Sequence, residues 1–564
     1  MIGRIGLVCV LVFLPPGLGA GSAANPVPQG PSLTRDEIDR IDAIFAPTDR
    51  IDGPGCALGI TRDGATVLER AYGRSNIEDG TPITTESIFE IGSMTKQFTA
   101  MAVTLLADDG RLSLDDDVRK FIPEMPVYER PITLRALLHH TSGLRELSQL
   151  FAFAGWRYPD DLVTRRDALD MLTRQRELNF TPGDRFSYSN SGYVLLAIVV
   201  ERASGRTFRQ FVEERVFRPL GMTRSQVHDD HTALVPGRTW AYARRGATWS
   251  LFMPVADYAG PDGVMTTTGD LLKWMRNADV HRVGGPTWWS ESAAPGLLNS
   301  GAPTAYGLGL FLQNFGGLRM LGHSGSTAGY TSDGVWFPAH KLGIAVLCNS
   351  NTPNPTTLGR AIAGMLLGVQ VQPPLPNAAS PDVAAVPIPA SELQAAAGAY
   401  KRPDSDVAWA FDVRDGQLIY AHSGASLKAL GSGRFLNASS RAVLDFSTPV
   451  DGAPGLVIRR DDVVEDRLTK MTTPPLSVSD AAAYVGEYSS TELQVTYAVV
   501  VESGALVLRQ PKAPDRALRP MWRDAFMGYN GVTLRFTRGP GAAVTGLRLS
   551  NALTRNVAFV RTSR

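Results

Sequence analysis

The sequence has few cysteines and no excess of either sign of charge. Its 564 residues include only three Cys, and 56 basic against 55 acidic residues leave a formal net charge of +1. This balance provides no basic face for nucleic acid or anionic lipid. We therefore expect a small molecule or short peptide as the partner, and the sequence makes no prediction of oligomeric state.

Long hydrophobic runs are absent as well. The chain opens with one basic residue, Arg4, an apolar stretch over residues 5–14 and a small-residue tail that ends at Ala24. The apolar stretch is far shorter than the ~20 residues that a membrane span needs. The pattern is typical of a secretory signal peptide over residues 1–24. It predicts a periplasmic or secreted protein without a membrane span.

Removal of that peptide would leave two cysteines, Cys56 and Cys348. Two residues exclude both a disulfide framework and a cysteine-based metal site. One bond between them is feasible in an oxidising compartment.

The chain is too long for one ordinary core, so we expect two or three domains. In residues 25–368, a hairpin with its turn at Asp63-Gly64 precedes a helical middle, and strands return before residue 348. Gly205 is expected to separate two of the helices. Strands from both ends around inserted helices indicate an α/β (α+β) fold with an antiparallel sheet.

Residues 369–390 are rich in Pro and Ala and are predicted to be a linker. The following segment, 391–564, shows short strands and an internal repeat. Gly398 and Gly416 recur as Gly486 and Gly504, with an offset of 88 residues in both cases. This predicts repeats over 391–472 and 477–564. Two copies of a four-strand unit would suffice for one eight-stranded, lipocalin-like barrel or for two half-barrels.

The stretch "FEIGSMTKQFTAM" places Ser93 and Lys96 three residues apart near the start of a predicted helix. A serine at that position is most often an N-cap, and a single S-x-x-K pattern arises easily by chance. Alternatively, a neutral Lys96 could take the hydroxyl proton and make Ser93 a nucleophile. That requires burial of the amine and a second polar partner.

Two further stretches supply polar partners. Tyr188 and Asn190 lie in a polar turn before an apolar helix, which alone would indicate a capping turn with a packing tyrosine. His323 and Gly325 open a predicted strand, and Ser326 follows. Taken alone, that histidine would be a surface residue on an edge strand.

In this order and spacing, Ser93-x-x-Lys96, Tyr188-x-Asn190 and His323-x-Gly325 resemble the three motifs of the penicillin-recognising serine hydrolases. The resemblance covers about residues 30–368. Within that family it is to the branch of class C β-lactamases, D-alanyl-D-alanine carboxypeptidases, D-aminopeptidases and esterases. It implies an acyl-enzyme on Ser93, formed with Lys96 and Tyr188 as proton carriers and hydrolysed by water.

The same resemblance implies a positioning role for Asn190 and an oxyanion hole from the N–H groups of Ser93 and Ser326. It also implies that no metal or other cofactor takes part. In this fold the first strand neighbours the last one, which would bring Cys56 close to Cys348.

One departure from the family pattern concerns His323, which stands where many members carry the lysine of K-T-G. Histidine is largely neutral at pH 7, which weakens recognition of a carboxylate. H-x-G and the added β region resemble D-aminopeptidases and related esterases, so we predict cleavage of amide or ester bonds in small peptides or related metabolites. By the same analogy, residues 391–564 are predicted to cap the active site.

Two alternatives stay open at this point. One is a β-lactamase or D-alanyl-D-alanine carboxypeptidase, and the other is a binding or regulatory protein with a weak hydrolase domain. Other histidines are given no catalytic role: "HDDH" over 228–231 is interpreted as a solvated loop, and His139 and His140 as part of a structural turn.

Overall fold

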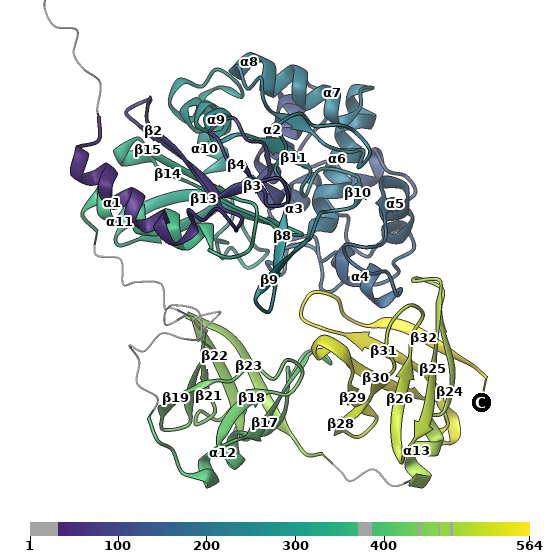
Figure 1. Cartoon of the computed structure of the whole chain (residues 1–564). Coiled ribbons are helices and arrows are strands. Elements are labelled where there is room, and N and C mark those ends of the chain that lie inside the picture. The colour runs from purple at the N-terminus through teal and green to yellow at the C-terminus, as the bar shows by residue number, and fades with distance from the viewer. Residues whose placement is uncertain (1–31, 370–385, 438–441, 461–462, 474–477, 564) are drawn as a thin grey trace, which may run out of the picture.

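The computed structural model describes residues 32–369, 386–437, 442–460, 463–473 and 478–563. They form an α/β domain followed by two antiparallel sheets that lie side by side on one flank of it (Figure 1). The predicted signal peptide and most of the predicted linker lie outside the described residues. No helix in the described ranges has the length and apolarity needed to cross a membrane.

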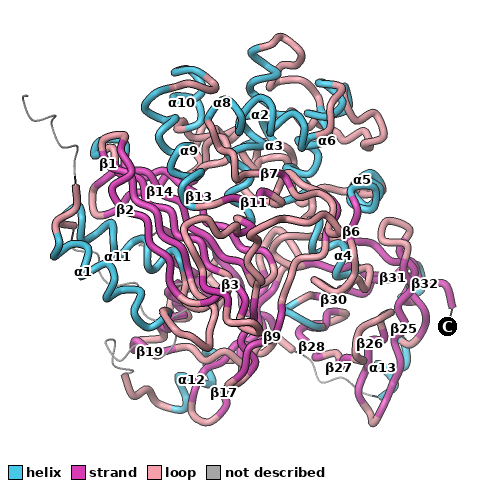
Figure 2. Tube along the Cα trace, turned by 45° about the horizontal axis from the view of Figure 1, so that its top comes forward, coloured by secondary structure: helices cyan, strands magenta, loops and turns pink. Residues whose placement is uncertain are grey.

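The α/β domain is built on a six-stranded antiparallel sheet made from both ends of the domain (Figure 2). In spatial order its strands are β12 (Phe311–Phe315), β13 (Leu318–Thr327), β14 (Tyr330–Phe337), β15 (Leu342–Cys348), β1 (Cys56–Arg62) and β2 (Ala65–Tyr72). The predicted hairpin is confirmed, with Asp63 and Gly64 both at positive φ between β1 and β2.

Helices cover both faces of this sheet. One face packs against α1 (Arg35–Phe45) and α11 (Pro355–Leu367), which share a hydrophobic cluster with β1 and β15. The other face carries the helical part of the domain: α2 (Lys96–Asp108), α3 (Leu134–Leu138), α4 (Leu147–Phe153), α5 (Arg165–Thr173), α6 (Asn190–Ser204), α7 (Phe208–Val212), α8 (Arg218–Leu220), α9 (Thr268–Val280) and α10 (Gly285–Ser292). Gly205 ends α6 in the left-handed conformation that glycine tolerates, as predicted.

The pairing of β1 with β15 joins chain segments nearly 300 residues apart. Cys56 stands opposite Cys348 in the ladder, their Cα atoms are 4.1 Å apart and the two form a disulfide. The expectation that they lie close together is confirmed.

A small three-stranded sheet leads the chain to the stretch that contains Ser93 and Lys96. Its strands, in order, are β5 (Phe89–Glu90), β11 (Val264–Thr266) and β7 (Gln226–Val227). Directly after β5, a 3-10 turn over Gly92–Thr95 continues into α2. Ser93 is thereby held between a strand and a long buried helix.

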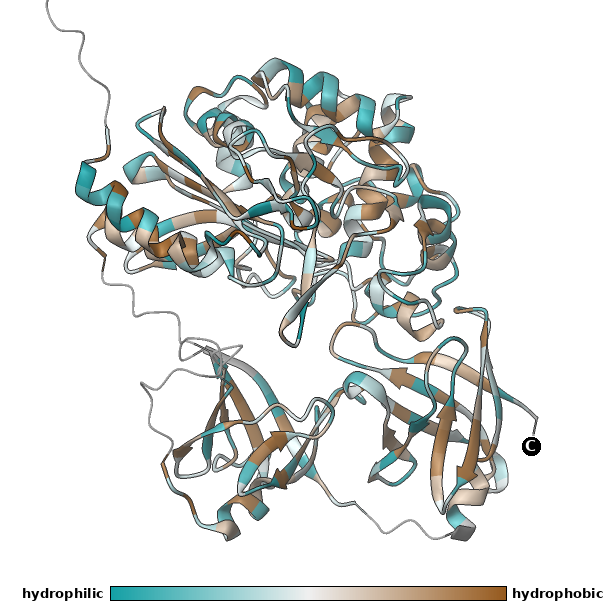
Figure 3. Ribbon diagram, in the orientation of Figure 1, coloured by the Kyte–Doolittle hydropathy of each residue, from teal (hydrophilic) through white to brown (hydrophobic). Residues whose placement is uncertain are grey.

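Each C-terminal repeat forms a sheet of its own. The first sheet contains β16 (Gly398–Lys401), β17 (Ala408–Arg414), β18 (Gln417–Tyr420), β19 (Lys428–Gly431), β20 (Arg434–Asn437), β21 (Ala442–Asp445), β22 (Gly455–Arg460) and β23 (Val463–Met471). The second contains β24 (Gly486–Ser490), β25 (Val495–Glu502), β26 (Ala505–Arg509), β27 (Arg516–Ala517), β28 (Arg519–Trp522), β29 (Ala525–Met527), β30 (Thr533–Arg538), β31 (Val544–Ser550) and β32 (Val557–Ser563). Both are nearly closed, and their hydrophobic residues alternate with hydrophilic ones along the strands (Figure 3).

The expectation of four strands per repeat was therefore too low, because each repeat has eight or nine. The duplication itself is visible in atomic detail. Tyr400 donates a hydrogen bond to the carbonyl of Ala396, at the end of α12 (Ala390–Ala396), and Tyr488 donates one to the carbonyl of Tyr484, at the end of α13 (Val478–Tyr484). Both pairs are related by the same 88-residue offset as the glycines.

Candidate active site

Ser93 lies in the 3-10 turn before α2 and is partly exposed. Neither that turn nor α2 has a side-chain cap hydrogen bond, so Ser93 does not serve as a helix cap. Its Oγ instead accepts a hydrogen bond from Lys96 Nζ at 2.9 Å. The serine is thus accessible and already in contact with the candidate base.

Lys96 is fully buried, and three neutral acceptors surround its amine. Besides Ser93 Oγ, Nζ donates to Asn190 Oδ1 at 2.8 Å and to the carbonyl oxygen of Pro261 at 2.9 Å. Desolvation lowers the pKa of Lys96 to about 7, although the carboxylates of Asp262 and Glu146 act in the opposite direction. The burial and the polar partner that the sequence argument required are both present.

Asn190 is held in turn by Glu146, a residue that the sequence analysis did not single out. The backbone N–H and Nδ2 of Asn190 donate to the two carboxylate oxygens of Glu146, at 2.7 and 2.8 Å. Glu146 is buried. This clamp fixes the side-chain amide so that its oxygen faces Lys96.

Tyr188 packs between Lys96 and His140. Its ring lies under the Lys96 amine, 4.8 Å from Nζ to the ring centroid, and packs on His140 at 4.3 Å. Burial raises the pKa of Tyr188 well above its usual value, while the hydroxyl of Ser93 acts to lower it. The phenol is therefore protonated at neutral pH, and its buried Oη has no hydrogen-bond partner in the described part of the chain.

His323 is buried in the interior of the sheet, because β13 lies between β12 and β14. Its Nε2 is 3.1 Å from Tyr306 Oη, and its Nδ1 is 2.5 Å from the carbonyl oxygen of Ser324. Desolvation first, and the charge on Lys96 second, lower its pKa to about 3. The imidazole is neutral at pH 7 and offers no positive charge to a carboxylate.

The backbone of β13 approaches the Ser93 turn closely. A Cβ on Gly92 would lie 2.6 Å from the amide nitrogen of Ser326, and a Cβ on Gly325 would lie 1.9 Å from the carbonyl oxygen of Ile91. Both positions therefore require glycine. The absence of these side chains brings the amide of Ser326 beside the turn that carries Ser93.

Two further acids, also missed by the sequence analysis, lie close to the site. Desolvation raises the pKa of the partly exposed Asp262 to about 6 and that of the buried Glu90 to about 8. The charge on Asp262 raises the pKa of Glu90 further, and the charge on Lys96 acts to lower the pKa of Asp262.

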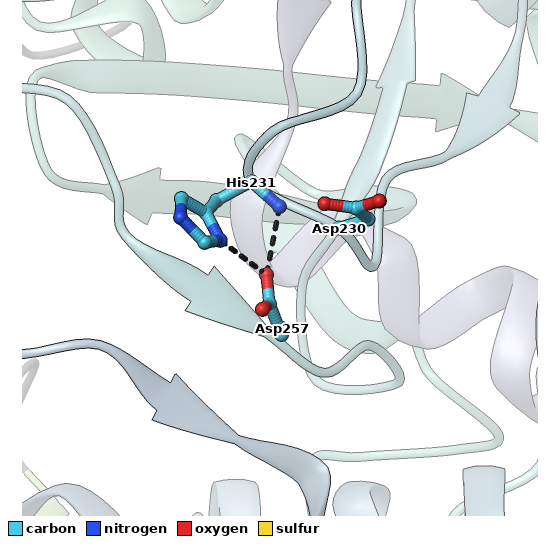
Figure 4. Close-up of side chains that lie close together, drawn as sticks. All are labelled: Asp230, His231 and Asp257. Atoms are coloured by element: carbon cyan, nitrogen blue, oxygen red, sulfur yellow. Dashed lines mark hydrogen bonds and ion pairs between the residues drawn. The ribbon is translucent and has the colours of Figure 1, made fainter.

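The other histidines have structural surroundings. His140 accepts a hydrogen bond from the Ser189 amide at its Nδ1, and His139 Nδ1 lies 3.2 Å from the Tyr306 carbonyl oxygen. In the 228–231 loop, Asp257 of β10 (Ala256–Asp257) binds the backbone and ring of His231 (Figure 4). Asp230 accepts from Thr232 instead.

The second C-terminal sheet contacts the segment that carries Glu146. The loop over residues 551–556, between β31 and β32, is here called the β31–β32 loop. Its Leu553 carbonyl and Thr554 hydroxyl both accept from the Glu146 amide at 3.1 Å. The neighbouring Arg145 is fully buried and donates to the carbonyl oxygens of Arg555 and Asn556 and to the carboxylate of Glu492.

Comparison with known proteins places this geometry in context. The family model described as Beta-lactamase matches residues 41–368. A D-aminopeptidase of Cereibacter sphaeroides (strain ATCC 17023) is 26% identical over 558 residues, which cover 94% of this chain and 100% of that protein. A D-aminopeptidase of Brucella anthropi is 31% identical over 281 residues, 49% of this chain and 52% of that one.

Two further matches extend the comparison. Penicillin-binding protein 4* of Bacillus subtilis (strain 168) is 29% identical over 306 residues, 51% of this chain and 67% of that protein. Among solved structures, the octameric penicillin-binding protein homologue from Pyrococcus abyssi covers 85% of this chain and 98% of its own, with a TM-score of 0.54 and 22% identity. This structural likeness concerns the fold alone.

Proposed function

The chain belongs to the beta-lactamase family and is a serine hydrolase, and from that premise we propose that it cleaves amide or ester bonds of small peptides or related metabolites through an acyl-serine at Ser93. The observation that carries this proposal is the Lys96 amine, buried between Ser93 Oγ and Asn190 Oδ1 with its pKa lowered to about 7. At neutral pH an amine with that pKa is neutral in about half of the molecules, and the neutral form can accept a proton.

In the acylation step, Ser93 Oγ attacks the substrate carbonyl carbon and its proton passes to the neutral amine of Lys96. The N–H groups of Ser93 and Ser326 stabilise the oxyanion. As the carbon–nitrogen or carbon–oxygen bond breaks, the protonated phenol of Tyr188 donates a proton to the leaving group. Proton transfer from the Lys96 ammonium then restores the phenol.

In the deacylation step, water attacks the ester carbon of the acyl-enzyme and gives up a proton to the amine of Lys96. The bond from that carbon to Ser93 Oγ breaks, and the serine oxygen takes the proton from the Lys96 ammonium. The product acid leaves and the site returns to its initial state.

The D-aminopeptidases that match this chain over nearly its whole length support amide substrates with a D-amino acid at the acyl side. The neutral, buried His323 weighs against efficient turnover of β-lactams, whose carboxylate other members hold with a lysine. Contacts of the β31–β32 loop with the segment that carries Glu146 support a capping role of the C-terminal region that limits the site to small substrates.

We also propose that the protein is exported. The N-terminal pattern supports this, and so does the Cys56–Cys348 disulfide, since such bonds persist in oxidising compartments. Cell fractionation and N-terminal sequencing of the mature chain test it. A chain that retains Met1 in the cytoplasm contradicts it.

A side-by-side assay tests the proposed function. Wild type and Ser93→Ala are compared on a D-amino-acid amide, a short-chain nitrophenyl ester and a chromogenic cephalosporin. We expect turnover of the amide or the ester that Ser93→Ala abolishes. Strong turnover of the cephalosporin alone would overturn the proposal in favour of a β-lactamase.

A further inference from the structure

A pocket of about 490 Å³ lies where the α/β domain meets both C-terminal sheets. We call it the junction pocket. The α/β domain contributes residues of the 179–188 segment, including Tyr188. The first sheet contributes residues 402–404 and 466–467, and the second contributes residues 552, 553 and 555 of the β31–β32 loop.

The charged residues that line the junction pocket are four arginines and two aspartates: Arg185, Arg402, Arg467, Arg555, Asp404 and Asp466. Asp466 pairs with Arg402 at 2.7 Å and Asp404 with Arg185 at 2.5 Å. Each aspartate thus already has an arginine partner. The formal charge of the lining is +2, in a chain whose net charge is only +1.

Arg555 is the side chain that most clearly lacks a ligand. It is 8% exposed, its nearest carboxylate oxygen, on Asp404, is 3.9 Å from Nη1, and its buried Nε has no partner in the described residues. Leaving a charged donor buried and unmatched is unfavourable, because the donor has lost its hydrogen bonds to water without gaining others. The backbone of Arg555 fixes its position, because its N–H donates to Asn179 and its carbonyl accepts from Arg145.

Arg467 carries the other uncompensated charge. Its side chain is exposed, and within the described ranges it makes no ion pair. A guanidinium presents its N–H donors in a planar fork that matches the two oxygens of a carboxylate. Arg555 and Arg467 therefore add a buried and an exposed donor group to the lining of the same pocket.

Tyr188 connects the junction pocket to the nucleophile. It lines the pocket, and its ring centroid also lies 4.8 Å from Lys96 Nζ. Tyr188 therefore belongs both to the pocket lining and to the surroundings of Lys96.

We propose that the junction pocket binds a carboxylate of the substrate at a distance from the scissile bond, with Arg555 and Arg467 as its ligands. This inference rests on the proposed hydrolase function and assigns its substrate class, namely small acidic amides or esters. His323 is neutral and cannot pair with a carboxylate. In this proposal the carboxylate binds instead in the junction pocket, which residues of the α/β domain and of both C-terminal sheets form.

Matched substrate pairs test the proposal. D-Alanine anilide and its 4-carboxyanilide differ by one carboxylate on the leaving group, and D-glutaminyl and D-glutamyl anilides differ by one on the acyl group. We expect the acidic member of at least one pair to have the higher kcat/KM. Arg555→Gln and Arg467→Gln should reduce that ratio about tenfold each.

The matched control is Arg245→Gln, since Arg245 is exposed on β8 (Tyr242–Arg245), outside the pocket lining. It should leave the ratio unchanged. Equal kcat/KM values within both pairs, or ratios that Arg555→Gln and Arg467→Gln do not alter, would overturn the inference while neutral anilide turnover keeps the proposed function.

Direct binding separates the two proposals further. Calorimetry with Ser93→Ala and glutarate, with inorganic phosphate as a second arm, measures anion binding without turnover. Glutarate binding that weakens at high salt and is lost in Arg467→Gln supports the inference. Binding of phosphate alone, or of neither anion, contradicts it. If neither an anilide nor the nitrophenyl ester is hydrolysed, the proposed function fails, whatever the outcome of this measurement.

Discussion

Lys96 and Arg145 are both fully buried basic side chains, but their surroundings differ. The amine of Lys96 contacts three neutral acceptors, and no carboxylate of the described residues forms an ion pair with it. The guanidinium of Arg145 contacts the Glu492 carboxylate at 3.1 Å as well as neutral oxygens. Desolvation lowers the pKa of both, but only lysine starts low enough to lose its proton near neutral pH.

The difference shows how one chain uses burial for two purposes. At the candidate active site, burial of Lys96 without a contacting counter-ion lowers its pKa, so that the amine can act as a base. At the domain junction, burial with a counter-ion makes a fixed ionic contact between the α/β domain and the second C-terminal sheet. Neighbouring residues 145 and 146 connect the two places, because Glu146 holds Asn190 against Lys96.

The largest effect is expected at the lysine. Lys96→Met removes the base, and we expect kcat to fall about 10³-fold or more. Lys96→Arg restores the charge but not the ability to lose a proton, so it should be equally inactive. Steady-state assays of both variants on the best substrate of the panel measure this. Near-normal turnover by Lys96→Arg would show that the positive charge alone is needed.

Replacing Arg145 should affect the stability of the fold rather than the catalytic rate. Arg145→Met leaves Glu492 buried without its partner, and we expect the unfolding free energy to fall by about 3–5 kcal/mol. Urea unfolding followed by tryptophan fluorescence measures the loss. Arg145→Met with Glu492→Leu should recover much of it. A single variant as stable as wild type would mean that the pair does not hold the junction together.

Weakening the hydrogen bonds between Glu146 and Asn190 should have a smaller effect. Glu146→Gln keeps the shape but loses charge-assisted hydrogen bonds to Asn190, so kcat should fall about tenfold. It also removes a negative charge that raises the pKa of Lys96, so the rising limb of the pH–rate profile should move to lower pH. Lost activity with an unmoved limb would indicate structural damage only.

The smallest effect is expected at Asp262. In wild type, kcat/KM should rise with pH through about 7, as Lys96 loses its proton. The Asp262 carboxylate stabilises the Lys96 ammonium, so Asp262→Asn should lower the pKa of Lys96 and shift that limb to lower pH, by less than about one unit. A pH series on both proteins measures the shift. A shift to higher pH would reverse the sign of the proposed coupling.

The sequence predicted the elements with local signals. The hairpin over residues 56–72 has a turn with a conformational requirement, and α6 ends at a glycine, so both could be placed from neighbouring residues. Asn190 was anticipated as a partner of Lys96 because three motifs together resemble a known family, whereas the Pro261 carbonyl was not anticipated. Both contacts bridge more than 90 residues, which no local pattern encodes.

The sequence analysis missed Glu146 and underestimated the number of C-terminal strands, because it reads only local patterns. Glu146 follows a turn motif and gives no sign that it will meet Asn190, because that contact depends on how α6 packs. The strand count of the C-terminal repeats was underestimated since strands such as β27 and β29 span only two or three residues. So short a segment has no measurable alternation.

The pairing of β1 with β15 imposes an order on biosynthesis. Strand β1 is made early, yet its partner is not complete until residue 348 has emerged, and β13, which lines the nucleophile, comes nearly as late. Until then the edge of β1 that will pair with β15 stays open and Ser93 lacks the amide of Ser326 beside it. The growing chain therefore carries its serine and lysine for some 230 residues of synthesis without a working site.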